Sequence, residues 1–332
     1  MRLTAGCQGR RGVPRPFAAA VCLALLGCGI AGCGPLGAVP SDGSVPVDET
    51  ATPLRTHDDT IAFVRSTGRE SDLLAVVTAD GSVRGLVTGR GSVSTPAWSA
   101  DGRSLAYAWR DPTEGGYRIR VADADGSNER TLTPGDAIDA SPSWSPAGDR
   151  IAWSSNRGGD GFAIFLMGRD GMTGHDGTDA VRLIEGQAPA WSPTGDWIVF
   201  VREMDGRGDL FLVRPDGSGL RDLVAGPADD VDPTWTPDGT AVVFASDRAG
   251  DHDLYRVEVD GGAVEPILVE SGADRDPAVS PDGSRIVFSR ATAETADLWI
   301  LDGDGTATQL TRDPRFDVDP AWQPLAGVQA GS

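Results

Sequence analysis

A short motif that returns at a nearly constant spacing constrains the fold of this chain more than any other feature. Each copy joins a Pro-x-Trp segment to a Gly-containing turn and a run of β-branched or aromatic residues. The copies start at Thr95, Ser141, Ala188, Asp232, Asp276 and Asp319. The equivalent positions Trp98, Trp144, Trp191, Trp235, Val279 and Trp322 are 43 to 47 residues apart. A repeat of this length is typical of a β-propeller, in which one repeat supplies one blade of four strands.

The local pattern within one repeat predicts those four strands. In the copy at Asp232, DPTW is a short extended stretch, TPDG is a tight turn, and AVVF is a β-branched second strand. A polar loop, SDRAGDHD, leads to a third strand, LYRVEV, which another turn connects to the fourth. We therefore expect an all-β domain of four-stranded antiparallel blades.

The two ends of the repeat array predict how the ring closes. The last copy stops after its first strand, and the array begins with a second strand at residues 60–65. Pairing of residues 320–323 with residues 60–65 would complete a sixth blade and leave no exposed sheet edge. The sequence thus predicts a closed, six-bladed propeller over residues 58–324. An open solenoid is the alternative, but it would need capping repeats.

Composition and charge exclude several other classes. The 44 Gly and 23 Pro among 332 residues argue against a helical bundle. With 49 Asp and Glu against 29 Lys and Arg, the formal net charge is −20. A polyanion of this kind is a poor ligand for nucleic acid or an anionic lipid surface.

The N-terminal segment predicts export and a lipid anchor. Four Arg precede the apolar run that starts at Phe17, and this run is too short for a stable membrane span. The small residues Ala31 and Gly32 before Cys33 resemble the lipobox of bacterial lipoproteins. Residues 1–32 are therefore a predicted signal peptide and Cys33 the lipidated residue, with Cys28 as the alternative. The export route, general secretory or twin-arginine, stays open.

The segments on either side of the propeller are predicted to be disordered. Residues 33–57 carry the anchor and then a Gly- and Pro-rich tether, and residues 325–332 form a short tail. All four Cys lie in the first 33 residues, so the propeller depends on core packing without disulfides.

The repeats resemble the WD-like repeat of TolB-type six-bladed β-propellers, with its Pro-x-Trp-Ser-Pro-Asp-Gly, Ile-x-Phe and Ser-x-Arg-x-Gly elements. The resemblance covers about residues 58–324. Departures are Val279 in place of Trp, Ala100 in place of Pro, and Leu325-Ala326 where the last turn is expected. The family includes periplasmic scaffold proteins, peptidase-associated propellers and sugar-active enzymes, so the resemblance leaves several functions open.

Catalytic and metal-binding motifs are weak in this sequence. No Gly-x-Ser-x-Gly elbow is present, and His57, His175 and His252 lack metal-ligand spacing. Sugar lyases of the resembling family use clustered histidines, which the sequence lacks. The Asp-x-Asp-Gly stretches at Asp123 and Asp302 suit hairpin turns better than calcium loops. We expect no cofactor, no metal and no catalysis.

Two sets of side chains return in register with the repeat. The Trp residues are expected to pack between blades, which we favour over a sugar-stacking platform. The Arg after each second strand should share one rim with the acids around each first strand, because both loops emerge on the same face. These Arg are Arg65, Arg110, Arg157, Arg202, Arg248 and Arg290, and the acids are Asp139, Asp230, Asp232, Asp274, Asp276, Asp317 and Asp319.

This loop-rich rim is the predicted binding face, since recognition residues usually lie on loops held by a rigid scaffold. The candidates for contact with a partner are Arg157, Arg202, Arg248, Asp230, Asp274 and Asp317. Pairing between the Arg and Asp members, with a purely structural role, is the competing interpretation.

The leading functional hypothesis is a monomeric, extracytoplasmic lipoprotein whose propeller binds another protein without catalysis. The membrane is contacted through the lipid anchor alone. Alternatives are a propeller that captures a small glycan or peptide in its channel and, less favoured, an enzyme acting on cell-wall sugars.

Overall fold

The computed structural model describes residues 60–66, 73–77, 82–88, 91–111, 113, 115–159, 161–171 and 179–324. The predicted signal peptide 1–32, both candidate lipidation sites (Cys33 and Cys28), the tether up to residue 57 and the tail 325–332 lie outside these residues. Within the described part, every regular element is a β-strand, and no helix is long and apolar enough to cross a membrane.

Four of the hydrogen-bonded sheets are four-stranded antiparallel blades in which consecutive strands are neighbours. The first contains β4 (Ser92–Trp98), β5 (Ser104–Arg110), β6 (Arg118–Asp123) and β7 (Arg130–Thr131). The second contains β8 (Asp139–Trp144), β9 (Arg150–Ser155), β10 (Ala163–Gly168) and β11 (Val181–Glu185). The third contains β12 (Gln187–Trp191), β13 (Ile198–Met204), β14 (Arg207–Val213) and β15 (Arg221–Val224). The fourth contains β16 (Asp230–Trp235), β17 (Ala241–Ser246), β18 (Asp253–Glu258) and β19 (Glu265–Leu268).

The fifth sheet has eight strands and joins both ends of the array. It contains β20 (Ala273–Val279), β21 (Arg285–Ala291), β22 (Ala296–Asp302), β23 (Ala307–Gln309), β24 (Phe316–Trp322), β1 (Ile61–Ser66), β2 (Leu73–Val77) and β3 (Val83–Val87). Last and first strands pair antiparallel, with Trp322 opposite Ile61 and Asp317 opposite Arg65. The pairing of the terminal strands is therefore the one that the sequence predicts.

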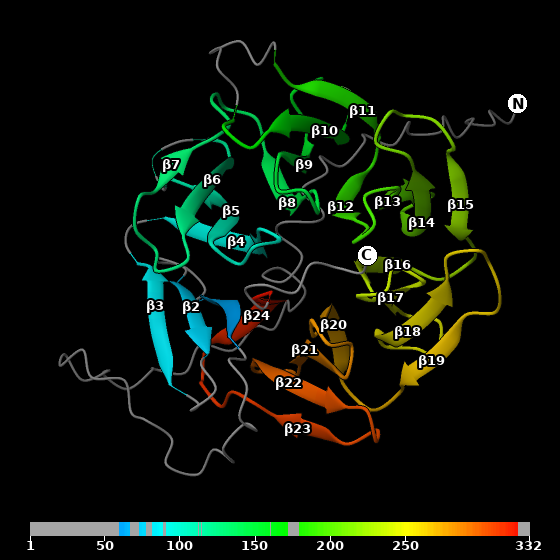
Figure 1. Cartoon of the computed structure of the whole chain (residues 1–332). Helices are drawn as coiled ribbons and strands as arrows, with labels where there is room; N and C mark the ends of the chain where they lie inside the picture. Colours follow the sequence, from blue (N-terminus) through cyan, green and yellow to red (C-terminus); the bar gives the residue numbers. More distant parts are fainter. Residues whose placement is uncertain are drawn as a thin grey trace, which may run out of the picture.

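The number of separate sheets is five, and not the six that the sequence predicts. The reason is one parallel residue pair, Ala296 with Phe316, which connects β22 to β24 and merges two groups of strands. The sheets stand radially around a common centre (Figure 1). The strands β4, β8, β12, β16, β20 and β24 lie innermost, and the fourth strands lie at the periphery.

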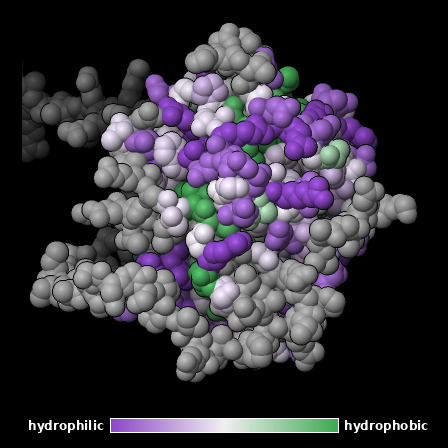
Figure 2. Space-filling model, turned by 60° about the vertical axis from the view of Figure 1, so that its left-hand side comes forward, coloured by the Kyte–Doolittle hydropathy of each residue, from purple (hydrophilic) through white to green (hydrophobic). Residues whose placement is uncertain are grey.

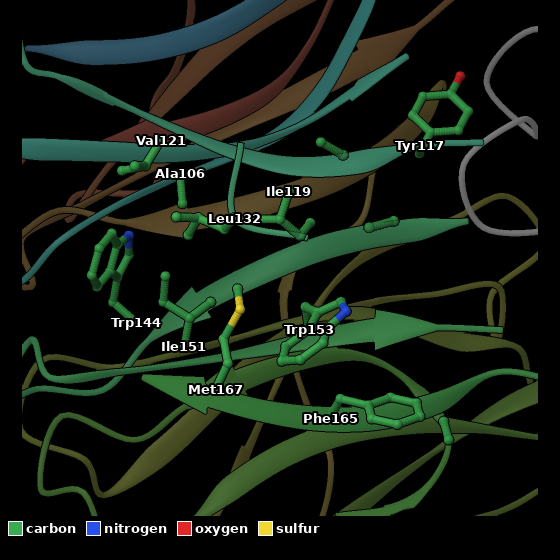
Figure 3. Packing of buried hydrophobic residues seen from close by; sticks show 13 residues of the cluster. Ala106, Tyr117, Ile119, Val121, Leu132, Trp144, Ile151, Trp153, Phe165 and Met167 are labelled. Carbon is green, nitrogen blue, oxygen red and sulfur yellow. The ribbon is translucent and has the colours of Figure 1, made fainter. Parts of the chain in front are cut away.

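The core lies between neighbouring blades. Figure 3 shows one such interface, where Leu132 and Ile119 of the first blade face Ile151 and Trp153 of the second. Trp153 and Ile151 are fully buried, and Phe165 packs beside Trp153 at a ring-centroid distance of 5.6 Å. Each Å² of apolar surface buried at such an interface stabilises the fold by about 25 cal/mol. Close packing of this kind holds neighbouring blades in fixed positions.

Candidate binding surfaces of the propeller

Arginine and aspartate pair at the face where each first strand begins. We call this set the loop rim. Its four pairs are Arg65 with Asp317, Arg157 with Asp139, Arg248 with Asp230, and Arg290 with Asp274. The closest nitrogen–oxygen distances are 2.6 to 2.7 Å, and the pairs at Arg65 and Arg290 are bidentate. The loops after the second strands and before the first strands therefore do share one face.

The aspartates of the loop rim are buried inside these pairs. The side chains of Asp274 and Asp317 are 0 % exposed, and that of Asp230 is 1 % exposed. Burial away from water raises the pKa of Asp274 and of Asp317, although the paired Arg opposes the shift. The expectation that Asp230, Asp274 and Asp317 touch a partner conflicts with this burial. Because each carboxylate faces inward to its Arg, none is available at the surface.

The arginines of the rim are also held by aromatic rings. The guanidinium of Arg248 lies 5.6 Å from the ring centroid of Phe244 and 4.9 Å from that of Tyr255. Arg157 lies in the same way over Trp153 and Phe165. Such contacts add cation–π attraction to the ion pair. The pattern favours a structural role for the ring of arginines.

Of the three predicted contact arginines, Arg157 and Arg248 keep 17 % and 28 % of their side chains exposed. Arg202 is half-buried and stacks on Phe200 and Phe211, while its nitrogens lie 3.4 Å from the carbonyl of Glu185. Contact of these arginines with a partner stays a prediction.

A second ring lies two residues further along each first strand. We call it the inner ring. Its members all precede a proline and all adopt the left-handed conformation, with φ between 48° and 53°. They are Thr95, Ser141, Ala188, Asp232, Asp276 and Asp319. A bulge interrupts the register of the strand pair at each of these positions.

The inner ring connects neighbouring blades by hydrogen bonds. The backbone N–H of Thr95 donates to Asp319 Oδ2 at 2.9 Å, and that of Ser141 donates to Thr95 Oγ1 at 3.1 Å. Sequence analysis assigns Asp232, Asp276 and Asp319 to the same rim as the paired acids. Their partners differ from those of the rim aspartates: Arg275 binds Asp232, Ser289 donates to Asp276, and the N–H of Thr95 donates to Asp319.

Three consecutive members of the inner ring are acidic, and Arg275 lies near two of them, Asp232 and Asp276. Desolvation and the neighbouring charges of Asp232 and Asp319 raise the pKa of Asp276 to about 8. Arg275, whose Nε lies 3.1 Å from Asp232 Oδ2, and Ser289, which donates to Asp276 Oδ2, oppose that shift. In the described part of the chain, no three His, Cys, Asp or Glu side chains are grouped to hold a metal ion.

The first strands end at the opposite face, which carries the turns that follow the Trp positions. We call it the turn face. A cavity of about 980 Å³ opens there around the central axis. Its wall contains the indoles Trp98, Trp144, Trp191, Trp235 and Trp322 and the prolines Pro146, Pro193, Pro237, Pro281 and Pro324. The sequence predicts binding at the loop rim, so this cavity lies at the end of the channel that the sequence did not favour.

Most of the Trp side chains connect neighbouring blades through a hydrogen bond. The indole N–H of Trp144 donates to the carbonyl of Ala97 at 3.1 Å, and that of Trp235 to Ala190 at 2.9 Å. Trp98 and Trp322 do the same toward Ala321 and Ala278, whereas Trp191 bonds to its own turn at Gly195. Each of the five indoles is 7 to 9 % exposed. The predicted packing role is confirmed, and the exposed edges also line the cavity.

A smaller cavity of about 450 Å³ adjoins the first one. Both contain Thr236, Pro237 and Asp238, and the smaller one extends to Arg256, Asp282 and Gly283. Hydrogen bonds from Ser280 and Ser284 lower the pKa of Asp282 to about 2, and those from Thr236 and Thr240 lower the pKa of Asp238. Both carboxylates are therefore charged at neutral pH.

The surface outside these hollows is mostly polar. Figure 2 shows a face on which hydrophilic residues predominate and hydrophobic residues form small patches between them. Large exposed apolar residues in the described part, such as Val181 and Met204, are scattered over separate strands. Isolated apolar residues of this kind do not form an interaction surface.

Comparison with known proteins finds the same domain type over most of the chain. The TolB beta propeller domain matches residues 51–184 and 113–328. Among solved structures, the chain resembles TolB from Acinetobacter baumannii, with a TM-score of 0.69 and 19 % identity over 80 % of this chain and 67 % of that one. It also resembles a putative TolB from Agrobacterium tumefaciens, with a TM-score of 0.62 and 22 % identity over 76 % and 88 % of the two chains.

An enzyme shares the architecture at lower similarity. An oligogalacturonate lyase in complex with manganese has a TM-score of 0.51 and 15 % identity over 73 % of this chain and 71 % of the lyase. These likenesses establish a common fold, which by itself carries both binding and catalytic functions.

Proposed function

This chain belongs to the TolB β-propeller domain family, and on that premise we propose that its propeller is a non-catalytic platform that binds another protein. The observation that carries the proposal is the cavity of about 980 Å³ at the turn face. It combines aromatic and proline surfaces with polar groups such as Asp101 and Asp238, which is the mixture that recognition pockets use. By contrast, the loop rim neutralises its charges internally.

The proposed platform is a closed ring of six blades. The eight-stranded sheet divides into β20–β23 and a composite group of β24, β1, β2 and β3. One residue pair connects the two groups, whereas five residue pairs join β24 to β1. A closed ring removes the exposed sheet edges and holds the cavity wall rigid, which lowers the entropy lost on binding.

The proposed location is the outer surface of the cell membrane. The positively charged segment before Phe17, the apolar run and the small residues before Cys33 support export and lipid attachment. The anchor is tested by Cys33→Ser, which should release the protein from the membrane fraction or leave it unprocessed. A processed variant that still sediments with membranes would assign lipidation to another residue, with Cys28 the next to replace.

The second candidate function is capture of a small glycan or peptide as a solute. Its supporting observation is that five indole edges surround one cavity, because flat aromatic surfaces also suit sugar rings. An enzyme acting on cell-wall sugars is the third. His252, the one histidine in the described ranges, lies 3.4 Å from Asp229 near the loop rim and does not line the cavity.

Site-specific crosslinking in intact cells tests the platform. A photo-reactive residue replaces Asp101 or Asp238 at the turn face, or Arg202, which follows a second strand on the same side as the loop rim, as the matched control. We expect protein adducts from the turn-face positions and none from the control. Adducts from Arg202 alone would move the binding face to the loop rim, and no adducts from any position would contradict a protein-binding role.

A further inference from the structure

The blade made of β20–β23 breaks the Trp pattern at a position that lines the cavity. Position 279 is Val, whereas the other five blades have Trp there. Val279 is partly exposed and lines the cavity. A valine fills much less space than an indole and has no N–H to donate.

The residue that pairs with Val279 on the second strand is more exposed than its equivalents in the other blades. In the other five blades the Trp lies opposite an aliphatic residue that is 0 to 1 % exposed. These residues are Leu105, Ile151, Ile198, Val242 and Ile61. Opposite Val279 stands Ile286, which is partly exposed. The smaller residue at position 279 thus coincides with partial exposure of its strand partner, which is buried in every other blade.

The preceding blade has a small residue where two other blades have an arginine. Arg150 and Arg285, each at the start of a second strand, extend over the Trp of the following blade at 5.4 and 5.0 Å. The equivalent residue before Val279 is Ala241. Ala241 is therefore shorter than these two arginines, as is Ser104 at the equivalent position of the first blade. We call the place where Val279 replaces Trp, beside Thr234 and its strand partner Ile286, the Val279 notch.

The notch has a hydrogen-bond acceptor at the place that an indole would reach. Trp98, Trp144, Trp235 and Trp322 donate to the carbonyl that precedes the Trp position of the neighbouring blade. For position 279 that carbonyl belongs to Thr234, which lines the cavity together with Val279. Valine cannot make this bond.

Negative charge lies directly beside the notch. Asp238 and Asp282 line the smaller cavity, which adjoins the larger one at Thr236 and Pro237. Both have lowered pKa values and are ionised at neutral pH. Arg256 also lines the smaller cavity, and it pairs with Glu258. A ligand that enters the notch therefore meets two carboxylates and one paired arginine at the adjacent turns, a balance that favours a positive charge.

We propose that the Val279 notch receives a tryptophan side chain of a partner polypeptide, with a neighbouring Lys or Arg of that partner directed to Asp238 and Asp282. The inference rests on the proposed protein-binding function and specifies the chemistry of the partner. The ligand indole takes the place that the chain's own Trp occupies in the other blades, donates to the Thr234 carbonyl and covers Ile286. A buried aromatic anchor with a charged flank is the usual form of an interface hot spot.

The test uses the full chain in detergent and the probe N-acetyl-Trp-Lys-amide, with N-acetyl-Ala-Lys-amide as the control ligand. Methyl NMR of Ile286 reports binding. We expect the Trp probe to shift the Ile286 methyl signal and the Ala probe to leave it in place. Val279→Trp should fill the notch and weaken the probe at least tenfold, while Val181→Trp, on an exposed part of β11, should change its affinity less than twofold.

A second pair of measurements keeps the test valid if the Val279→Trp variant fails to fold. In the double variant Asp238→Asn and Asp282→Asn, the affinity for N-acetyl-Trp-Lys-amide should fall about threefold. The affinity for N-acetyltryptophanamide, which has no positive charge, should stay the same. An Ile286 signal that does not respond to the Trp probe overturns the inference, as does a response to diacetylchitobiose in its place. If crosslinks from position 238 form in cells but the Trp probe does not bind at the notch, the inference fails and the proposed function stands. If the notch binds the probe and no crosslinks form, the proposed function fails, and with it the assignment of the notch to a partner polypeptide.

Discussion

Two sets of aspartates, only two residues apart along the first strands, have opposite electrostatic surroundings. At the loop rim, Asp274 and Asp317 each face one arginine in a bidentate pair. In the inner ring, Asp276 lies close enough to Asp232 and Asp319 to feel both charges, and Arg275 is the cation near Asp232 and Asp276. The first set neutralises buried charge within each pair, whereas the second concentrates it. Repetition of a motif therefore does not imply repetition of a role.

The largest effect is expected when one blade loses its loop-rim aspartate and its inner-ring aspartate together. Deletion of residues 317–332 removes Asp317, Asp319 and most of β24, leaving β1 with β2 as its one antiparallel neighbour. Arg65, 7 % exposed, would then lack its bidentate partner. We expect loss of the cooperative unfolding transition in a urea titration followed by Trp fluorescence. A truncated chain that unfolds at the urea midpoint of the parent would disprove the importance of this pairing.

The loop rim alone is tested by Arg65→Met, which leaves the carboxylate of Asp317 buried and without its bidentate partner. Removal of one partner of a buried ion pair costs about 3–5 kcal/mol of the free energy of unfolding. The double variant with Asp317→Leu serves as the control and should recover most of that loss, because no charge then stays buried. Equal stability of single and double variants would show that the carboxylate is hydrated.

The inner ring is tested by pH. Because the pKa of Asp276 is about 8 in the folded chain and its ordinary value is 3.8, the folded state holds the proton more tightly between these values. The free energy of unfolding should therefore fall as pH rises from about 4 to 8, by at least ~1 kcal/mol. Asp276→Asn should flatten this decline in thermal melts recorded at pH 5, 7 and 9. A wild-type melting temperature that increases over the same range would contradict the assignment.

The smallest effect is expected at the exposed hairpin aspartates, which belong to neither set. Asp125 accepts hydrogen bonds from the backbone and the hydroxyl of Ser127 in a solvent-exposed turn. Asp125→Asn should change the free energy of unfolding by no more than about 0.5 kcal/mol. Addition of calcium should leave the melting temperature of the parent unchanged, since the turn interpretation provides no further ligands. A calcium-dependent increase that Asp125→Asn abolishes would favour the calcium loop.

Much of the architecture is predictable from sequence because each strand and turn has a local cause. The spacing of the Trp positions predicts repeated four-stranded units, and the truncated last copy predicts the pairing of residues 320–323 with the first described strand. The count of separate sheets differs only through the contact of Ala296 with Phe316. That contact depends on how two neighbouring loops approach in space, and no sequence pattern encodes it.

The candidate site was less accessible to sequence reasoning. Loop length and charge favoured the rim with Asp230 and Arg248, yet these residues pair with each other. The cavity is instead bordered by Trp and Pro side chains whose sequence signal is that of packing. A signal for the notch did exist in the replacement of Trp by Val279, although its pairing with Ile286 depends on the strand register.

By itself, the sequence determined the repeat, the strands, the hairpin turns, the interblade position of the indoles and the expectation of an exported lipoprotein. The tertiary structure alone decided which aspartates are neutralised, which end of the channel is hollow and where apolar surface is left uncovered. The physical reason is that strands and turns follow from interactions between near neighbours in the chain. Charge pairing and cavity shape depend on distances between blades, and such distances exist only once the ring has assembled.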